Sequence, residues 1–241
     1  ELGNMQNLNE LLLNGNHLYG QIPDEICNNE NLTIVLSNQN SNLITNYFCP
    51  PFPSCIETSS INESNYCDNG ADCISDDSTD GLVLWNNCFS IENTTIINFS
   101  GENGTDQDVL HGPIALEIGQ FLNLDTLDLS GNNLSGPIPS EITNLSNLKT
   151  LLLQNNNLAG SLPLGMGSMS QLQDLIFINN YIEGELTAEI CSISNLKSFG
   201  ASNNLLSGII PQEIASLTNL EILSLFENNF SGPIPNELFN M

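Results

Sequence analysis

An asparagine that returns every 24 residues is the feature that most constrains the fold of this chain. Each copy stands in the same frame of leucines, followed by a glycine and, in most copies, by an Ile-Pro or Leu-Pro pair. Self-similarity at this spacing indicates a solenoid, in which each repeat packs only against its neighbours. The recurring residues are Asn132, Asn156, Asn180, Asn204 and Asn228.

The positions within one repeat predict its local structure. Leu148, Leu151 and Leu153 have the spacing of a short strand that turns these side chains inward, and the strands of successive repeats should stack in parallel. The asparagine that follows donates and accepts hydrogen bonds, so we expect the asparagines to form an internal ladder where the chain turns. A glycine four residues later marks a bend that glycine adopts cheaply. These glycines are Gly136, Gly160, Gly184, Gly208 and Gly232.

Residues 124–241 and 8–32 resemble the plant-type extracellular leucine-rich repeat, whose pattern is LxxLxLxxNxLSGxIPxxLxxLxx. The resemblance implies an α/β solenoid with a parallel concave β-sheet and short convex helices or 3-10 turns. Receptor ectodomains and polygalacturonase-inhibiting proteins are built in this way. Members of this family are mainly binding modules, and the fold alone does not name a ligand.

The charge of the chain restricts its partners. The chain contains two basic and 28 acidic residues, which gives a net charge of -26. Nucleic acid and anionic membrane surfaces are therefore excluded as expected partners, whereas cationic partners, divalent ions or simple hydration stay open. No apolar run is long enough for insertion of this segment into a membrane.

A column of glutamates follows the Ile-Pro or Leu-Pro pair or its equivalent. Carboxylates in a first helical turn interact favourably with the free N–H groups there, which is the structural interpretation. Calcium is the alternative, because it binds several oxygen ligands, but no DxDxDG-type loop predicts a dedicated site. We therefore predict no metal site and no cofactor beyond N-linked glycans. The column contains Glu25, Glu141, Glu189, Glu213 and Glu237.

Eight N-x-S/T triplets predict N-glycosylation and hence an extracellular location, either secreted or at the cell surface. The asparagine-rich frame generates some of them by accident, Asn133 and Asn229 among them. Those that lie outside the regular repeats carry more weight. The acceptors are Asn31, Asn62, Asn93, Asn98, Asn103, Asn133, Asn144 and Asn229.

The cysteines divide the chain. Six of the seven lie in the stretch where the frame fails, and we expect disulfides that close two caps of the solenoid. Zinc is disfavoured because His17 and His111 are isolated from this cluster. The expected domains are residues 1–43, the end of a first repeat block; 44–93, a C-terminal cap followed by an N-terminal cap; and 94–241, a second block uncapped at its C-terminal end. The cysteines are Cys27, Cys49, Cys55, Cys67, Cys73 and Cys88, and every pairing stays open. Cys191 is expected to be a buried free thiol.

A ligand surface is expected on the outward positions of the concave strands. Apolar residues there are flanked by polar ones, a pattern that favours a protein contact. Ser130 and Ser202 are expected to face outward in the same way. The candidate residues are Asp128, Leu152, Gln154, Ile176, Ile178 and Phe226.

No catalytic motif is present, since the chain lacks GxSxG, HExxH and GxxxxGK[ST], and we predict that it is not an enzyme. The predicted function is a non-catalytic secreted or cell-surface protein that offers an interaction surface to a protein or glycan. The alternative is a structural subunit of an extracellular glycoprotein filament or matrix. This alternative rests on the two termini, ELGNM and ELFNM, which occupy the same repeat positions and suggest self-association of solenoid ends, head to tail.

Overall fold

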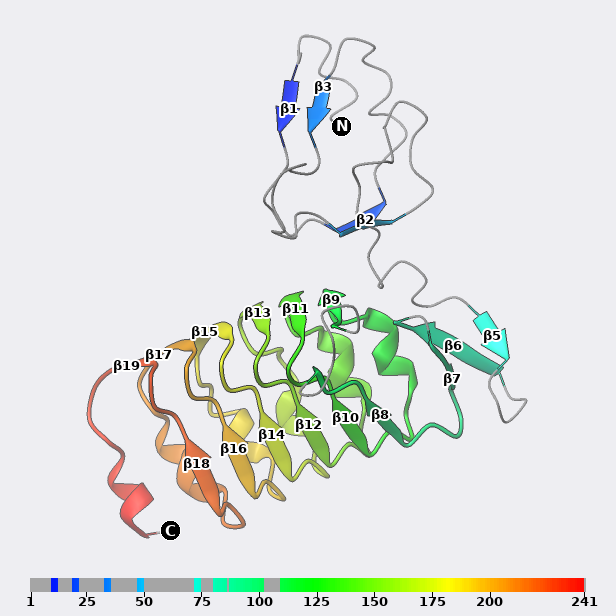
Figure 1. Ribbon diagram of the computed structural model, residues 1–241. Coiled ribbons are helices and arrows are strands. Elements are labelled where there is room, and N and C mark those ends of the chain that lie inside the picture. The colour runs from blue at the N-terminus through cyan, green and yellow to red at the C-terminus, as the bar shows by residue number, and fades with distance from the viewer. Residues whose placement is uncertain are drawn as a thin grey trace. The chain divides into compact units, whose positions relative to one another are not determined.

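A computed structural model describes residues 80–85, 87–101 and 109–238, together with the backbone of five short strands before residue 75 and of residues 239–240. The chain forms two compact units, residues 1–68 and 69–241 (Figure 1). The division falls inside the predicted cysteine-rich region.

The first unit contains two pairs of parallel strands. Strand β1 (Glu10–Leu12) pairs with β3 (Thr33–Val35), and β2 (Tyr19–Gln21) pairs with β4 (Tyr47–Cys49). In the first pair Leu11 lies opposite Ile34. Parallel pairing of strands that are one repeat apart is what a stack of similar repeats requires.

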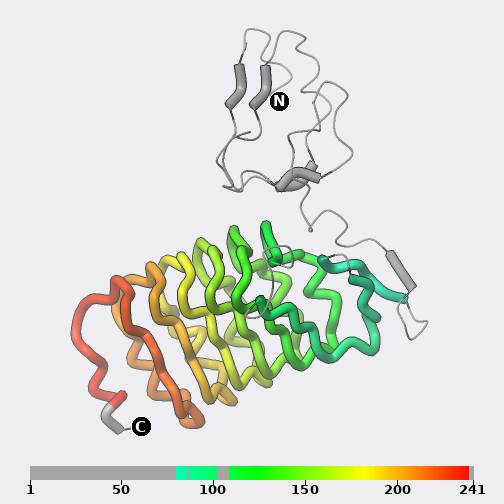
Figure 2. Tube along the Cα trace, in the orientation of Figure 1, coloured from blue at the N-terminus to red at the C-terminus, as the bar shows by residue number. Residues whose placement is uncertain are grey.

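The second unit is built on a six-stranded parallel sheet, which we call the concave sheet (Figures 1 and 2). Each strand pairs with the strand one repeat away; Leu127, for example, lies opposite Leu151. Its strands are β8 (Ile96–Asn98), β10 (Thr126–Asp128), β12 (Thr150–Leu152), β14 (Asp174–Ile176), β16 (Ser198–Gly200) and β18 (Ile222–Ser224).

A second parallel sheet follows the recurring asparagines, and the sequence did not predict it. The segment between asparagine and glycine is extended, and it lies at the same register in each repeat, so its backbone groups pair with those of the neighbouring repeats. The strands are β9 (His111–Gly112), β11 (Asn133–Gly136), β13 (Asn157–Gly160), β15 (Tyr181–Glu185), β17 (Leu205–Gly208) and β19 (Asn229–Phe230).

The glycines that close these strands confirm the expected bend. Gly136 has φ 78° and Gly184 has φ 86°, in the left-handed region that disfavours other residues.

Short 3-10 helices complete the repeats, as predicted. Pro139 and Pro211 stand directly before two of them, where a missing backbone donor costs nothing. Glu141 and Glu213 lie in the first turns, in agreement with the structural interpretation of the glutamate column. The helices are η5 (Leu116–Gln120), η6 (Ser140–Asn144), η7 (Met166–Ser168), η8 (Ile190–Ser192), η9 (Gln212–Ser216) and η10 (Asn236–Asn240).

The core runs through the solenoid between the two sheets and the helices. Leu127, Leu151 and Leu175 are each fully buried at the centre of a concave strand. Where the pattern changes to aromatic residues, Phe177 and Phe199 pack with ring centroids 5.9 Å apart. The inward positions read from the leucine spacing are therefore confirmed.

An antiparallel sheet stands before the first repeat of this block. It contains β5 (Asp72–Ile74), β6 (Asp80–Leu84) and β7 (Asn87–Ser90). Trp85 packs edge-on against Phe99 at 5.5 Å, and Phe89 against Phe121 at 6.3 Å. These contacts cover the β8 end of the core with aromatic side chains, which keeps its apolar surface from water.

Candidate functional site

The recurring asparagines hold the turns from which the site residues project. Asn180 Oδ1 accepts a hydrogen bond from the amide of Leu158 at 2.9 Å, and its Nδ2 donates to the carbonyls of Leu153 and Phe177, each at 3.0 Å. One side chain thus satisfies backbone groups of two successive repeats. The predicted ladder is confirmed, with bonds that run through the backbone between one asparagine and the next.

The six predicted concave residues lie where the alternation placed them. Asp128, Leu152 and Ile176 end their strands half-buried, each next to a fully buried leucine. Gln154 and Ile178 follow two residues later and are also half-buried, whereas 61% of Phe226 is exposed. Whether these residues bind a ligand stays a prediction.

The polar members of this face are engaged with their own turns. Asp128 Oδ1 accepts hydrogen bonds from the backbone amide of Ser130 at 3.0 Å and from its hydroxyl at 2.6 Å. Ser130 and Ser202 lie on this face, since the Ser130 hydroxyl bonds Asp128, but they are buried, at only 2% and 0% exposed. The Ser202 hydroxyl bonds the hydroxyl of Ser224 at 2.7 Å, so local hydrogen bonds draw these short side chains against the sheet.

Gln154 differs from the other polar residues of the face. Its Oε1 is buried and has no hydrogen-bond partner among the described residues. An unsatisfied buried acceptor costs free energy, so this side chain is held at a cost in stability.

The apolar members lie on β12, β14 and β18 or in the turns after these strands. Ile176 and Ile178 lean over Gly200, where an added Cβ would lie 3.0 Å from Ile176 Cδ1 and 3.1 Å from Ile178 Cδ1. Ile222, which sequence reasoning did not single out, is 58% exposed on the strand beyond. It stands two residues before Ser224, so the same alternation identifies it as outward. We call the group the apolar patch: Leu152, Ile176, Ile178, Ile222 and Phe226.

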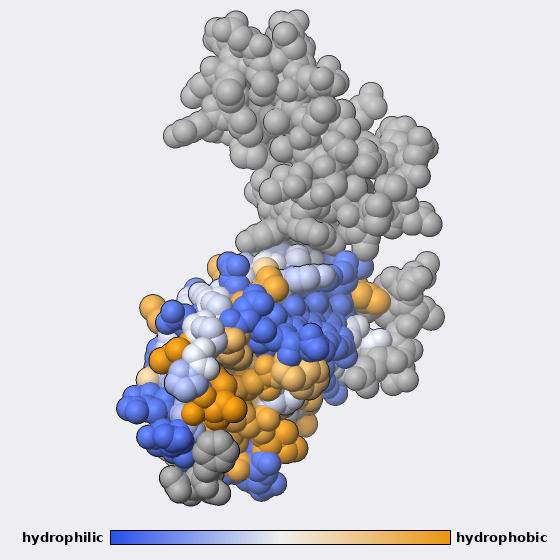
Figure 3. All heavy atoms as spheres, turned by 90° about the vertical axis from the view of Figure 1, so that its left-hand side faces the viewer, coloured by the Kyte–Doolittle hydropathy of each residue, from blue (hydrophilic) through white to orange (hydrophobic). Residues whose placement is uncertain are grey.

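Apolar atoms are also visible on the face of the second unit at its β18 and β19 end (Figure 3). Exposed side chains near that end include Ile209 at 62%, Ile222 at 58% and Ile234 at 61%. A hollow of about 490 Å³ lies between the Ile-Pro segments of the last two repeats, lined by Pro211, Pro235 and their neighbours.

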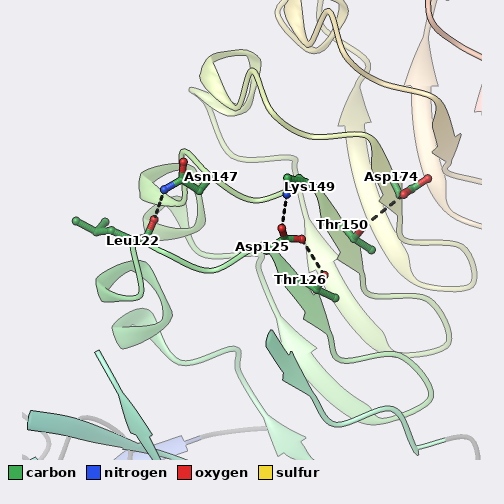
Figure 4. Close-up of polar contacts among 7 residues, drawn as sticks. All are labelled: Leu122, Asp125, Thr126, Asn147, Lys149, Thr150 and Asp174. Atoms are coloured by element: carbon green, nitrogen blue, oxygen red, sulfur yellow. Dashed lines mark hydrogen bonds and ion pairs between the residues drawn. The ribbon is translucent and has the colours of Figure 1, made fainter. Parts of the chain in front are cut away.

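The start of the concave strands forms a polar edge (Figure 4). Lys149 Nζ pairs with Asp125 Oδ2, and the Lys149 ammonium group lowers the pKa of the Asp125 carboxyl. Asn147 Nδ2 donates to the carbonyl of Leu122 at 2.9 Å, which ties this edge to the preceding repeat. In the described part of the chain Lys197 makes no ion pair, and it is exposed.

The described glutamates of the predicted column make local contacts. Glu189 Oε1 accepts a hydrogen bond from the backbone amide of Gly165, one repeat earlier, at 2.6 Å. Glu141 Oε2 accepts one from the Ser140 hydroxyl at 3.2 Å. Within the described residues no three His, Cys, Asp or Glu side chains are grouped in a way that could hold a metal ion. Glu25 lies outside the residues whose side chains are described.

The glycosylation acceptors differ in accessibility. Asn93, Asn98, Asn144 and Asn229 are exposed. Asn133 is half-buried, and its Nδ2 lies 3.1 Å from His111 Nδ1 while its Oδ1 accepts from Asn157 Nδ2. The remaining three acceptors, Asn31, Asn62 and Asn103, lie outside the described residues.

The cysteines are partly described. Cys88 is disulfide-bonded. Cys191 is a buried free thiol, as expected, and burial raises its pKa to about 11. The other cysteines of the predicted disulfide set lie outside the residues whose side chains are described: Cys27, Cys49, Cys55, Cys67 and Cys73.

His111 is the histidine that the structure describes. Its side chain is half-buried, and this desolvation lowers its pKa. It bonds an amide of the second sheet. No helix among the described residues is long and apolar enough to cross a membrane.

Five segments match the family model described as Leucine Rich Repeat: residues 7–29, 123–145, 147–169, 195–217 and 219–241. The model does not match the residues between 169 and 195, although they form β14, β15 and η8 with the same register as their neighbours. This repeat carries Phe177 in place of a core leucine and lacks the proline of the Ile-Pro pair. No curated protein matches the chain.

Solved structures of plant receptor ectodomains are similar to the chain. The leucine-rich-repeat ectodomain of the membrane receptor kinase GASSHO1/SCHENGEN3 from Arabidopsis thaliana, in complex with CASPARIAN STRIP INTEGRITY FACTOR 2, is 27% identical with a TM-score of 0.59. That match covers 100% of this chain and 26% of the receptor chain.

Two further ectodomains extend this likeness. The Arabidopsis receptor kinase HAESA, in complex with the peptide hormone IDA and the co-receptor SERK1, is 26% identical with a TM-score of 0.57, over 98% of this chain and 32% of that one. The ectodomain of SOBIR1 from Arabidopsis thaliana is 27% identical with a TM-score of 0.53, over 68% of this chain and 82% of that one. The chain thus spans about a quarter to a third of the two longer receptors.

Proposed function

We propose that this chain, which carries leucine-rich repeats of the plant receptor type, is a non-catalytic secreted or cell-surface protein that binds a protein ligand on its concave sheet. The observation that carries the proposal is the apolar patch. Its members project from three strands of the concave sheet, β12, β14 and β18, or from the turns after them, and Phe226 and Ile222 are more than half exposed. Burial of such side chains favours association by about 25 cal/mol for each Å² removed from water.

The surroundings of the patch favour a protein over a glycan as the ligand. Between Ile178 and Phe226, the small residues Gly200 and Ser202 are buried, and Ile178 closes over Gly200. The apolar side chains that flank these two residues match a protein segment that packs apolar side chains of its own against them. The similar ectodomain of HAESA was solved with the peptide hormone IDA and the co-receptor SERK1, and that of GASSHO1/SCHENGEN3 with CASPARIAN STRIP INTEGRITY FACTOR 2, which supports this class of ligand.

Paired substitutions test the proposal. A ligand is first isolated with the whole chain as bait from the extracellular fluid of the source organism, and its affinity is measured by calorimetry. Ile178→Ser and Phe226→Ser should each weaken binding by about 10-fold or more, since a buried anchor contributes about 1–3 kcal/mol. Leu164, which is 80% exposed and stands just before η7, supplies the matched control Leu164→Ser. Equal weakening by all three variants would exclude the concave sheet as the binding face.

Head-to-tail assembly into a filament or matrix stays the alternative prediction, and it rests on the sequence. Electron microscopy of the native material separates the two functions. Discrete particles support a ligand-binding protein, whereas fibres with an axial repeat support the structural subunit.

A further inference from the structure

A second hollow lies at the turn between the concave sheet and the second sheet. It has a volume of about 390 Å³ and is lined by asparagine amides and one tyrosine. The buried amides of Asn156 and Asn180 belong to the internal ladder and are fully engaged with the backbone. The chemistry available to a ligand therefore comes from the more exposed residues Asn155, Asn157 and Tyr181.

One row of amides ends in this hollow with an unused donor. Asn203 Nδ2 donates to Asn179 Oδ1 at 2.6 Å, and Asn179 Nδ2 donates to Asn155 Oδ1 at 2.6 Å. The preceding repeat has Gly131 at the equivalent position, so Asn155 Nδ2 has no amide to bond within the described residues. Hydrogen bonds in a chain polarise one another, which makes this last N–H group a stronger donor.

A second row ends there with an unused acceptor. Asn157 Nδ2 donates to Asn133 Oδ1 in the preceding repeat. The following repeat has Tyr181 at the equivalent position, so in the described part of the chain Asn157 Oδ1 accepts no hydrogen bond. The two places where the repeats depart from asparagine thus leave one donor and one acceptor at the same hollow.

Tyr181 adds an aromatic surface. It is 55% exposed, and its hydroxyl has no hydrogen-bond partner among the described residues. An exposed aromatic ring offers an apolar face and a polar tip at a small cost in conformational entropy.

We propose that this hollow binds a neutral sugar residue of a glycan. The hydroxyl groups of a pyranose donate and accept at once, which matches the Asn155 donor and the Asn157 acceptor, and its C–H face packs on the Tyr181 ring. No charged side chain lines the hollow, and the net charge of -26 repels acidic sugars. The site is separate from the apolar patch, so it does not depend on the proposed protein ligand.

The test uses the whole chain and four neutral probes: cellotetraose, xylotetraose, mannotetraose and tetra-N-acetylchitotetraose. We expect at least one to bind at millimolar concentration, as measured by saturation-transfer NMR and calorimetry. Tyr181→Ala should weaken that binding about 10-fold, the upper range for an aromatic contact. Asn155→Gly should weaken it about 3- to 10-fold, the worth of one hydrogen bond. Glycine tolerates the φ of 59° at that position, so the fold is retained.

Two control variants keep the result specific. Leu205 occupies the same strand position as Tyr181 one repeat later, is 44% exposed and does not line the hollow, so Leu205→Ala should leave sugar binding unchanged. Phe226→Ser, which tests the protein ligand, should also leave it unchanged. The proposal is overturned if no probe binds. It is also overturned if Tyr181→Ala and Asn155→Gly bind the probe with the same affinity as the unchanged chain. A third outcome would overturn it as well: the two variants lower the affinity for a protein ligand but leave the affinity for every sugar unchanged.

Discussion

Asn156 holds the backbone of the preceding repeat in place: its Oδ1 accepts a hydrogen bond from the amide of Leu134 at 2.9 Å. Its Nδ2 donates to the carbonyl of Leu129 in that repeat at 2.8 Å and to the carbonyl of Leu153 in its own at 3.1 Å. Only 7% of the residue is exposed, so water does not replace these bonds when the side chain is removed. One amide therefore couples two repeats.

Asn156→Ala should lower the free energy of unfolding by about 2–4 kcal/mol, because it strands buried backbone groups without partners. Asn157→Ala is the matched control, since the neighbouring asparagine is half-buried and bonds only a side chain; its cost should stay below about 1 kcal/mol. Chemical denaturation of both variants measures the difference. Equal costs would contradict the role assigned to the ladder.

Glu227 has a strained backbone. Its φ is 52°, in the left-handed region, where the equivalent residues of the other repeats are Gly131, Asn155, Asn179 and Asn203. Asn enters this region more easily than Glu does, so Glu227→Asn should raise the free energy of unfolding by about 0.5–1 kcal/mol.

The matched control for this change is Glu221→Asn, which removes the same charge from an exposed residue of the same repeat whose φ is not positive. Thermal unfolding should show a higher free energy of unfolding for Glu227→Asn and no change for Glu221→Asn. A gain of the same size at position 221 would mean that charge, and not backbone strain, is responsible.

Cys191 should make stability fall in alkaline solution. Burial raises the pKa of its thiol from 9.0 to about 11, so the folded state binds the proton more tightly than the unfolded state. This contribution is fully present below pH 9.0 and is lost as the pH rises through about 11. The free energy of unfolding, measured by urea titration across this range, should therefore decline less steeply in Cys191→Ala. Identical slopes would show that the thiol does not titrate as described.

Glycan mapping separates the predicted acceptors. Asn144 lies exposed on η6, so its sequon should be occupied if the chain is secreted. Asn133 should be largely unmodified in folded molecules, because a glycan on its amide nitrogen would disturb its contacts with His111 and Asn157. Mass spectrometry after enzymatic deglycosylation in heavy-oxygen water marks each occupied site. High occupancy at Asn133 together with an intact fold would be incompatible with this arrangement.

The repeat made most of the solenoid predictable. Spacing alone identified Leu151 and Leu153 as core, Gly136 as a bend and Asn180 as a member of an internal ladder, because each position recurs with the same conformation in every repeat. The outward concave residues followed from the same alternation, including Ile222, which was overlooked although the pattern contained it.

Other features could not be predicted from the frame. The second sheet depends on register between neighbouring repeats, and a segment such as Asn157–Gly160 has no strand pattern of its own. The burial of Ser202 depends on its hydrogen bond to Ser224 in the next repeat. The hollow beside Tyr181 arises where two rows of amides stop, so it reflects departures from the repeat and not the repeat itself.

The most direct test of the central claim is hydrogen–deuterium exchange of the chain with and without its isolated ligand. The concave sheet as binding face predicts slower exchange around β12, β14, β16 and β18 and in the turns that carry Ile178 and Phe226, with η6 to η9 unchanged. Protection confined to the 3-10 helices or to the second sheet would contradict the claim that the apolar patch is the ligand surface.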